Sequence, residues 1–253
     1  MSPRRDGPGR DGGQLPLALR CPPDQRFEAF VPASASEAVL PLLRALAAAA
    51  GADWCYLSGA AGTGKTHLAL ATCAAAEAHG RRAAYLPLAS ASGRLQEALQ
   101  SLHDYDLIAL DGLDAVAGRR DDELALFDFH NRAHDAGKAV LYAARTLPAE
   151  LPLTLPDLRS RLSQCVRIVL APLDDAGRRE VLRVRAQRRG LMFDDAAIDW
   201  LLKRVDRDLA SLTALLDRLD RASLAAQRRL TVPFLRQVLG GERGEAGDGK
   251  REF

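Results

Sequence analysis

The amino-acid sequence predicts an α/β fold with a parallel sheet flanked by helices, followed by a small helical domain. Between residues 52 and 169, short apolar runs alternate with helical patterns. The runs are continuous rather than alternating, which is typical of strands that helices cover on both faces. A glycine-rich loop directly follows the first run, and from Pro172 onward only helical periodicity remains.

Length and composition exclude several classes of protein. The chain has 253 residues and 47% hydrophobic content, which is ample for one large or two small domains. No apolar run approaches the roughly 20 residues of a membrane span, and no secretory signal is apparent. The four cysteines lack metal-site spacing, which favours reduced thiols. The net charge of +2 does not indicate nucleic-acid binding, and we expect a cytoplasmic protein without membrane contact.

Residues 1–24 are predicted to form a flexible arm. The first 13 are rich in glycine, proline and charge, and Pro22 and Pro23 prevent a helix from continuing. Leucines at 15, 17 and 19 alternate, so an extended chain presents them on one face. Such a face packs on its own domain or on a partner, and the residues alone leave both possibilities open.

Residues 25–171 are predicted to form the α/β domain. Its expected strands are 53–59, 82–88, 105–111, 138–144 and 165–173. Helical patterns lie between them at 63–80 and 123–138, with glycines suited to ending each helix at 80 and 137.

Residues 172–239 are predicted to form the helical domain, and 240–253 a disordered tail. Helical patterns cover 173–190, 194–205, 206–229 and 231–239. Asp174 and Asp175 are candidate N-caps of the first helix, and Gly190 ends it. We interpret the arginines of this helix as a solvated face balanced by acids rather than as a nucleic-acid surface.

The strongest motif is GAAGTGKTH at 59–67, which fits G-x-x-x-x-G-K-S/T between a strand and a helix. Glycines let backbone N–H groups converge on a phosphate, and the N-terminus of the helix adds its dipole. Lys65 is expected to reach the β-phosphate of ADP or the β- and γ-phosphates of ATP, and Thr66 to coordinate Mg²⁺. The candidate nucleotide-binding residues of this loop are Gly59, Gly62, Thr63, Gly64, Lys65, Thr66 and His67.

Asp111, at the end of the run LIALD, is the second candidate for holding Mg²⁺. P-loop enzymes that hydrolyse their nucleotide usually carry another acid next, but here that position is Gly112. We interpret Asp114 as a turn or capping residue rather than a replacement. The sequence therefore predicts nucleotide binding with weakened hydrolysis, which leaves open whether the chain is itself an enzyme.

From about residue 14 to 239 the chain resembles AAA+ ATPases of the DnaA initiator clade, and more closely the Hda type, the regulatory inactivators of DnaA. The motifs that carry the resemblance are QLPLAL, RFEAFVPA, GAAGTGKTH, LIALDGLDAVAG, LPDLRSRL and the long stretch ending in RRLTVPFLRQVL. The phosphate loop alone occurs in many unrelated NTPases, whereas the long C-terminal stretch is far more specific. The initiator continues into a DNA-binding domain for which this sequence leaves no room, so we expect an inactivator.

This resemblance implies a negative regulator of DNA replication initiation with two partners and a possible homodimer. One partner is the sliding clamp (β subunit) of the DNA polymerase, loaded on DNA. The other is the DnaA initiator, whose ATP would meet Arg161 as an arginine finger in trans, with Arg159 as the second candidate. Phe30 and Val31 would line the adenine side of the nucleotide site. The clamp-binding residues would be Gln14, Leu15, Leu17 and Leu19.

The sequence also departs from this family. Ala143 and Arg145 stand where a polar residue and an aspartate are usual, and the nucleotide-sensing arginine falls on Ala210, with Arg207 one turn earlier. These departures weaken the case for hydrolysis by the chain itself and for discrimination between ADP and ATP. Two alternatives stay open: a helicase-loader-type ATPase, against which Gly112 argues, and a DnaA-like initiator paralogue acting as a DNA-binding scaffold.

Overall fold

The computed structural model describes residues 25–33, 36, 38–51, 53–204, 215, 216, 219 and 230–240. Within them, five parallel strands form one sheet in the order β2-β3-β4-β1-β5. This confirms the predicted parallel sheet. The strands are β1 (Cys55–Ser58), β2 (Ala83–Pro87), β3 (Leu107–Asp111), β4 (Ala139–Ala144) and β5 (Val166–Val169).

Burial of the strands follows their place in the sheet. Nearly every residue of the central strands β1, β3 and β4 is buried, as predicted. The same prediction is wrong for the edge strands. In β5 only Ile168 is buried, and Val169 is 59% exposed, because helices cover the middle of the sheet more completely than its edges.

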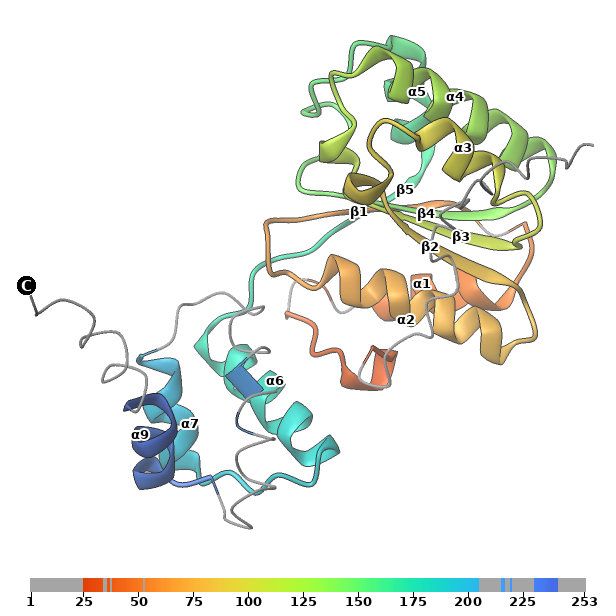
Figure 1. The fold of residues 1–253 in the computed structure, drawn as a ribbon. Coiled ribbons are helices and arrows are strands. Elements are labelled where there is room, and N and C mark those ends of the chain that lie inside the picture. The colour runs from red at the N-terminus through yellow and green to blue at the C-terminus, as the bar shows by residue number, and fades with distance from the viewer. Residues whose placement is uncertain are drawn as a thin grey trace, which may run out of the picture.

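Helices cover both faces of the sheet (Figure 1). Each face has its own hydrophobic cluster, and neighbouring strand residues such as Tyr56 and Leu57 contribute to opposite clusters. The sequence patterns did not predict α1 or α3. On one face lie α1 (Val39–Ala48) and α2 (Lys65–Ala78), and on the other α3 (Leu95–Gln100), α4 (Arg120–Asp135) and α5 (Pro156–Gln164).

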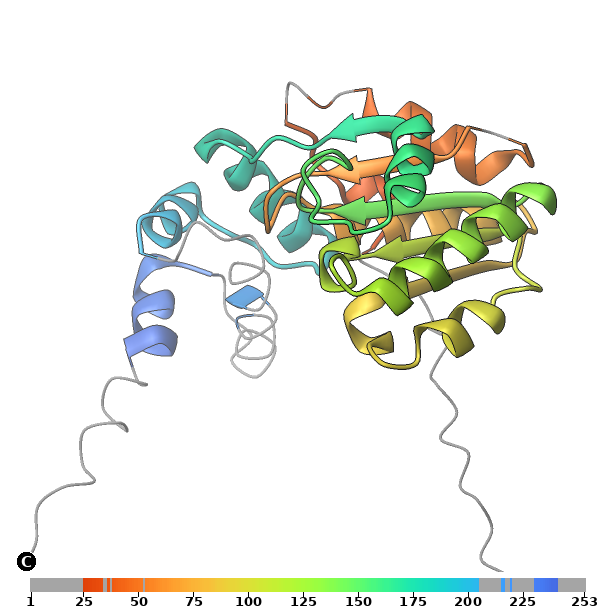
Figure 2. The ribbon, with the colours of Figure 1, turned by 90° about the horizontal axis from the view of Figure 1, so that it is seen from above.

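The C-terminal part is helical, as predicted, and Figure 2 shows it beside the sheet. It contains α6 (Asp175–Arg188), α7 (Asp195–Leu202) and α9 (Val232–Gly240), which surround a third hydrophobic cluster. Asp174 caps α6 by accepting a hydrogen bond from the backbone N–H of Gly177 at 2.7 Å. No helix in the described part of the chain combines the length and apolarity that a bilayer-spanning segment requires.

Several predicted features lie outside the described residues. These are the arm with its candidate clamp residues Gln14, Leu15, Leu17 and Leu19, most of the helix predicted at 206–229, the positions Arg207 and Ala210, and the tail beyond residue 240.

Candidate functional site

The glycine-rich loop connects β1 to α2, and Lys65 is the first residue of that helix. Gly64 has a left-handed backbone with φ of 94°, and a Cβ there would lie 2.7 Å from Cε2 of Phe30. Both the conformation and the close ring disfavour any residue with a Cβ. The loop thus has the strand–loop–helix geometry in which backbone N–H groups at a helix N-terminus meet a phosphate.

Lys65 lies folded back over this loop. Its Nζ donates to the carbonyl oxygens of Gly59 at 2.6 Å and Ala60 at 2.8 Å. Burial lowers the pKa of Lys65 below its ordinary value, against the opposing charges of Asp111 and Asp114. The oxygens of a phosphate would offer the ammonium group a charged acceptor in place of these neutral carbonyls.

Thr66 and Asp111, the two predicted Mg²⁺ ligands, meet in space. The Thr66 hydroxyl donates to Asp111 Oδ2 at 2.6 Å, and the Tyr85 hydroxyl donates to the same oxygen at 2.9 Å. No three His, Cys, Asp or Glu side chains cluster as a metal site in the described part of the chain. A hydroxyl and one carboxylate nevertheless fit Mg²⁺, which commonly takes its remaining ligands from phosphate and water.

Tyr85 was not predicted as a site residue. Burial, then the negative charge of Asp111, raises the pKa of Tyr85 well above its ordinary value, because both disfavour the phenolate. Its position in β2, next to β3, directs this hydrogen bond to the end of β3.

The segment before α1 packs against the first turn of α2. His67 Nε2 lies 2.9 Å from the carbonyl oxygen of Arg26, and the rings of His67 and Phe30 are 5.7 Å apart. Phe30, a predicted adenine contact, therefore lies beside the phosphate loop. Val31 follows it and is half-buried.

Both candidate arginine fingers lie on α5, in different environments. The Arg159 guanidinium donates to the carbonyl oxygen of Leu153 at 2.6 Å. Arg161 is exposed, and its guanidinium makes no hydrogen bond or ion pair with any residue that the structure describes. Arg161 lines a cavity of about 300 Å³ together with Trp54, His134 and other residues.

This cavity lies at the end of the sheet where the strands begin, whereas the phosphate loop lies at the end where they finish. Trp54 and Lys138, which line it, precede β1 and β4, whereas the loop follows the other end of β1. At about 3.3 Å per residue, the four residues of β1 separate these two ends of the sheet by roughly 13 Å. Arg161 is therefore remote from the phosphate loop of its own chain.

Two family models match this chain. Residues 22–169 match the bacterial DnaA ATPase domain, and residues 175–239 match the lid domain of Hda. The first match alone covers more than half of the 253 residues. The chain belongs to the DnaA family and has an Hda-type lid.

Solved structures share the fold of this DnaA-family chain. Domain III of DnaA from Thermotoga maritima has a TM-score of 0.75 at 20% identity, covering 90% of this chain and 98% of that one. DnaA from Aquifex aeolicus, bound to AMPPCP, has a TM-score of 0.64 at 21% identity, covering 78% of this chain and 66% of that one. The RuvB branch migration motor of Thermotoga maritima has a TM-score of 0.60 at 19% identity, covering 81% of this chain and 68% of that one. The likeness confirms the predicted AAA+ fold.

The DnaA-type domain turns sharply after Asp111. Gly112 is left-handed with φ of 86° and opens a short turn over Leu113–Ala115. Asp114 in this turn accepts hydrogen bonds from the backbone N–H of Arg145 at 2.9 and 3.2 Å. This agrees with the interpretation of Asp114 as a turn residue. A glutamate in place of Gly112 would have to adopt an unfavourable backbone conformation.

We expect Gly112→Ala to lower the free energy of unfolding by about 1 kcal/mol, because the left-handed region is unfavourable for alanine. Space is not the cause, since a Cβ at Gly112 meets nothing within 4 Å. Gly112→Asn serves as the control and should lose less, because asparagine tolerates this conformation. Urea unfolding measures both variants, and equal stability of the alanine variant and the wild type would contradict the strain.

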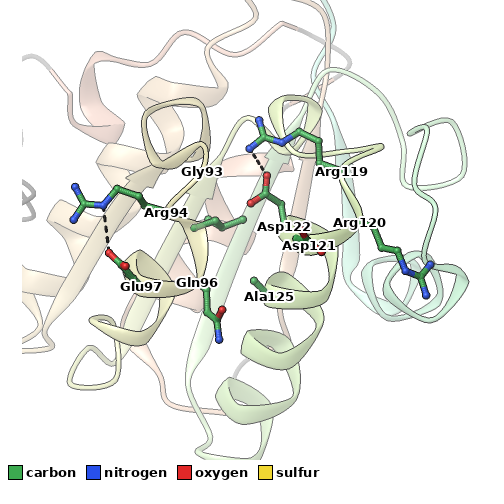
Figure 3. A pocket seen from close by; sticks show the side chains of 10 residues that line it. Gly93, Arg94, Gln96, Glu97, Arg119, Arg120, Asp121, Asp122 and Ala125 are labelled. Carbon is green, nitrogen blue, oxygen red and sulfur yellow. Dashed lines mark hydrogen bonds and ion pairs between the residues drawn. The ribbon is translucent and has the colours of Figure 1, made fainter.

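A second cavity, of about 500 Å³, lies between the start of α3 and the start of α4 (Figure 3). Arg94 pairs with Glu97 at 3.2 Å, and Arg119 pairs with Asp122. Positive and negative groups are equal in number, so the lining has no surplus charge that would select an anion. Its charged residues are Arg94, Arg119, Arg120, Glu97, Asp121 and Asp122.

Glu123, which sequence reasoning missed, fixes the start of the helix that carries Arg161. This fully buried carboxylate accepts hydrogen bonds from the backbone N–H groups of Gly118, Thr154 and Leu155 and from the Thr154 hydroxyl, at 2.7 to 3.0 Å. Burial alone would raise the pKa of Glu123, but these hydrogen bonds outweigh it and lower the pKa below its ordinary value.

Proposed function

We propose that this chain is a nucleotide-bound negative regulator of DNA replication initiation that acts on the DnaA initiator. The DnaA-type domain and the Hda-type lid support this role. The observation that carries the proposal is the place of Arg161, exposed and remote from the chain's own phosphate loop. An arginine at the end of the sheet away from the phosphate loop can act on the nucleotide of another molecule.

The chain's own nucleotide would be ADP or ATP. Lys65 and the loop residues would bind its phosphates, and Phe30 and Val31 would lie beside its adenine. Thr66 and Asp111 would hold Mg²⁺, which would offset the negative charge of the phosphates. The relative from Aquifex aeolicus, solved with the ATP analogue AMPPCP, supports a nucleotide in this fold.

The chain would retain its nucleotide rather than turn it over. Gly112 supplies no carboxylate to polarise an attacking water, and the register partner of Asp111 on β4 is Ala143. The chain would instead activate hydrolysis on DnaA, where Arg161 neutralises charge that develops on the transferred phosphoryl group. An arginine supplied by a partner accelerates such reactions by about 10³ to 10⁵.

The arm would connect this regulator to the sliding clamp on newly replicated DNA, in the cytoplasm. Three leucines buried in an apolar groove contribute roughly 1.5–3 kcal/mol each. Ordering a flexible arm offsets several kcal/mol, so the peptide alone would bind at about micromolar strength. Gln14 would add a hydrogen bond that sets the register of the peptide.

Changing Gln14, Leu15 and Leu17 together to alanine should eliminate clamp binding and leave the melting temperature nearly unchanged. The arm is predicted to be flexible and to add little to the core of the domain, so the change would cost little stability. Pull-down on clamp-loaded DNA and thermal unfolding measure the two effects. A variant with Arg4, Arg5 and Asp6 changed to alanine is the control and should bind normally. A strongly lowered melting temperature would instead mean that the arm packs on its own domain.

Single-turnover hydrolysis tests the proposal as a whole. DnaA preloaded with labelled ATP is mixed with clamp-loaded DNA, with and without the wild-type chain. Acceleration that requires both the chain and the clamp supports the proposed function. Equal rates with and without the chain would refute it.

A further inference from the structure

The carboxylate of Asp111 is held by hydroxyl groups from two other elements. Asp111 ends β3, Tyr85 lies in β2 and Thr66 lies in the first turn of α2. Both hydroxyls donate to the same oxygen, Asp111 Oδ2, at 2.9 Å from Tyr85 and 2.6 Å from Thr66. The other oxygen, Oδ1, accepts no hydrogen bond within the described part of the chain. The fold therefore fixes one oxygen of this carboxylate and leaves the second to a further ligand.

The register of the sheet explains why a tyrosine makes this contact. Tyr85 is paired with Ala109, two residues before Asp111, so the two positions are separated by roughly 7 Å along the strand direction. The long phenol side chain spans this distance, whereas the hydroxyl of a serine or threonine would remain close to its own backbone. The ring of Tyr85 also packs against the hydrophobic cluster on the α2 side of the sheet. Packing thus fixes the ring, and the ring directs the hydroxyl to Asp111.

Two hydrogen bonds from different elements restrict the rotation of the Asp111 side chain more than one does. Asp111 is the last residue of its strand and is only half-buried, so packing alone leaves its carboxylate free to turn. Residues that hydrogen-bond to a metal ligand orient it before the ion binds, and their loss typically weakens metal binding by about 10- to 100-fold. The contact from Tyr85 has the geometry of such a supporting interaction.

We propose that Tyr85 is a positioning residue that orients Asp111 for Mg²⁺ and thereby strengthens binding of the ion together with the nucleotide. The inference rests on the proposed nucleotide binding. Tyr85 acts through Asp111 and needs no contact with the phosphates. Its hydroxyl should therefore matter for the affinity of the ion and not for the affinity of the nucleotide without metal.

Tyr85→Phe tests this role, because it removes the hydroxyl and keeps the ring that packs in the cluster. Binding of Mn²⁺, a paramagnetic substitute for Mg²⁺, to the chain saturated with ADP is measured by electron paramagnetic resonance. The variant should bind the ion about tenfold more weakly than wild type, at the lower end of the range for a residue that supports a metal ligand. Its affinity for ADP in EDTA, measured by isothermal titration calorimetry, should be unchanged. Thermal unfolding without nucleotide checks that the variant is folded.

Two controls separate this inference from the proposed function. Tyr105→Phe removes the same hydroxyl from a half-buried tyrosine outside the site and should leave both affinities unchanged. Lys65→Ala should lose ADP with and without metal, and wild-type affinity in that variant would overturn nucleotide binding by the loop. If Lys65→Ala loses ADP, wild-type or tighter Mn²⁺ binding in Tyr85→Phe would overturn the role of Tyr85 alone. An equal loss of ADP affinity in EDTA would overturn it too, because Tyr85 would then support the pocket as a whole.

Discussion

Arg161→Ala should reduce the stimulation of ATP hydrolysis on DnaA by about 10³-fold, the lower end of the range for an arginine supplied by a partner. Nucleotide binding and clamp binding should be unchanged, because Arg161 lies far from the phosphate loop and outside the arm. The structure also predicts little effect on stability, since this side chain is exposed and its guanidinium contacts no polar partner among the described residues. Single-turnover hydrolysis of ATP preloaded on DnaA is the measurement.

Two further variants sharpen that experiment. Arg161→Lys should rescue poorly, because a single ammonium cannot reproduce the fork that grips phosphate oxygens. Arg159→Ala is the matched control on the same helix and should retain stimulation, because Arg159 is already bound to the carbonyl of Leu153. Full stimulation by Arg161→Ala would refute its role, and loss in Arg159→Ala would transfer that role to Arg159.

Glu123→Ala should lower the free energy of unfolding by about 3–5 kcal/mol. The change leaves the backbone N–H groups of Gly118, Thr154 and Leu155 without their acceptor. Each buried donor without a partner costs about 1–3 kcal/mol, and partial relaxation reduces the sum. Asp121→Ala, in the same turn of α4 but exposed, is the control and should change stability by about 0.5 kcal/mol or less. Equal urea midpoints for the two variants would contradict this account.

The stability that Glu123 contributes should depend on pH. Its pKa is lower in the folded chain than its ordinary value of 4.5, so the folded state favours the ionised form. The contribution is therefore fully present above that ordinary value and is lost as the pH falls through the lower folded value. The stability difference between wild type and Glu123→Gln should accordingly be largest near neutral pH and shrink as the pH falls below that ordinary value. A constant difference across this range would exclude a role for the ionised carboxylate.

Local patterns were sufficient for the parts of the fold whose signal is local. Each strand lies in a mostly apolar run, and the phosphate loop combines fixed spacing with a strand before it and a helix after it. The short helix α3 consists of good helix formers, LQEALQ, but it lacks a side-chain cap, and six residues are too few to show a helical periodicity. The edge strand β5 carries Arg167 between its apolar residues, a signal of exposure that the sequence analysis did not use, and its exposure also depends on where it lies in the sheet.

The residues that sequence reasoning missed act through partners distant in the chain. Glu123 is one of three acids that begin α4, and only folding brings Thr154 to it. Tyr85 meets Asp111 because β2 pairs with β3. Arg145 was visible only as a departure from the family pattern, and folding brings its backbone N–H to Asp114.

Arg161 and the phosphate loop lie at opposite ends of the strands, so the two ends of the molecule differ in what they can contact. In the proposed function the Arg161 end of the sheet would meet the nucleotide end of DnaA, so the contact would be head-to-tail, or heterologous. A two-fold dimer that joined the Arg161 edges of two copies would bury both arginines and block their action on DnaA. Any homodimer that leaves the regulator active would therefore leave the Arg161 surface uncovered.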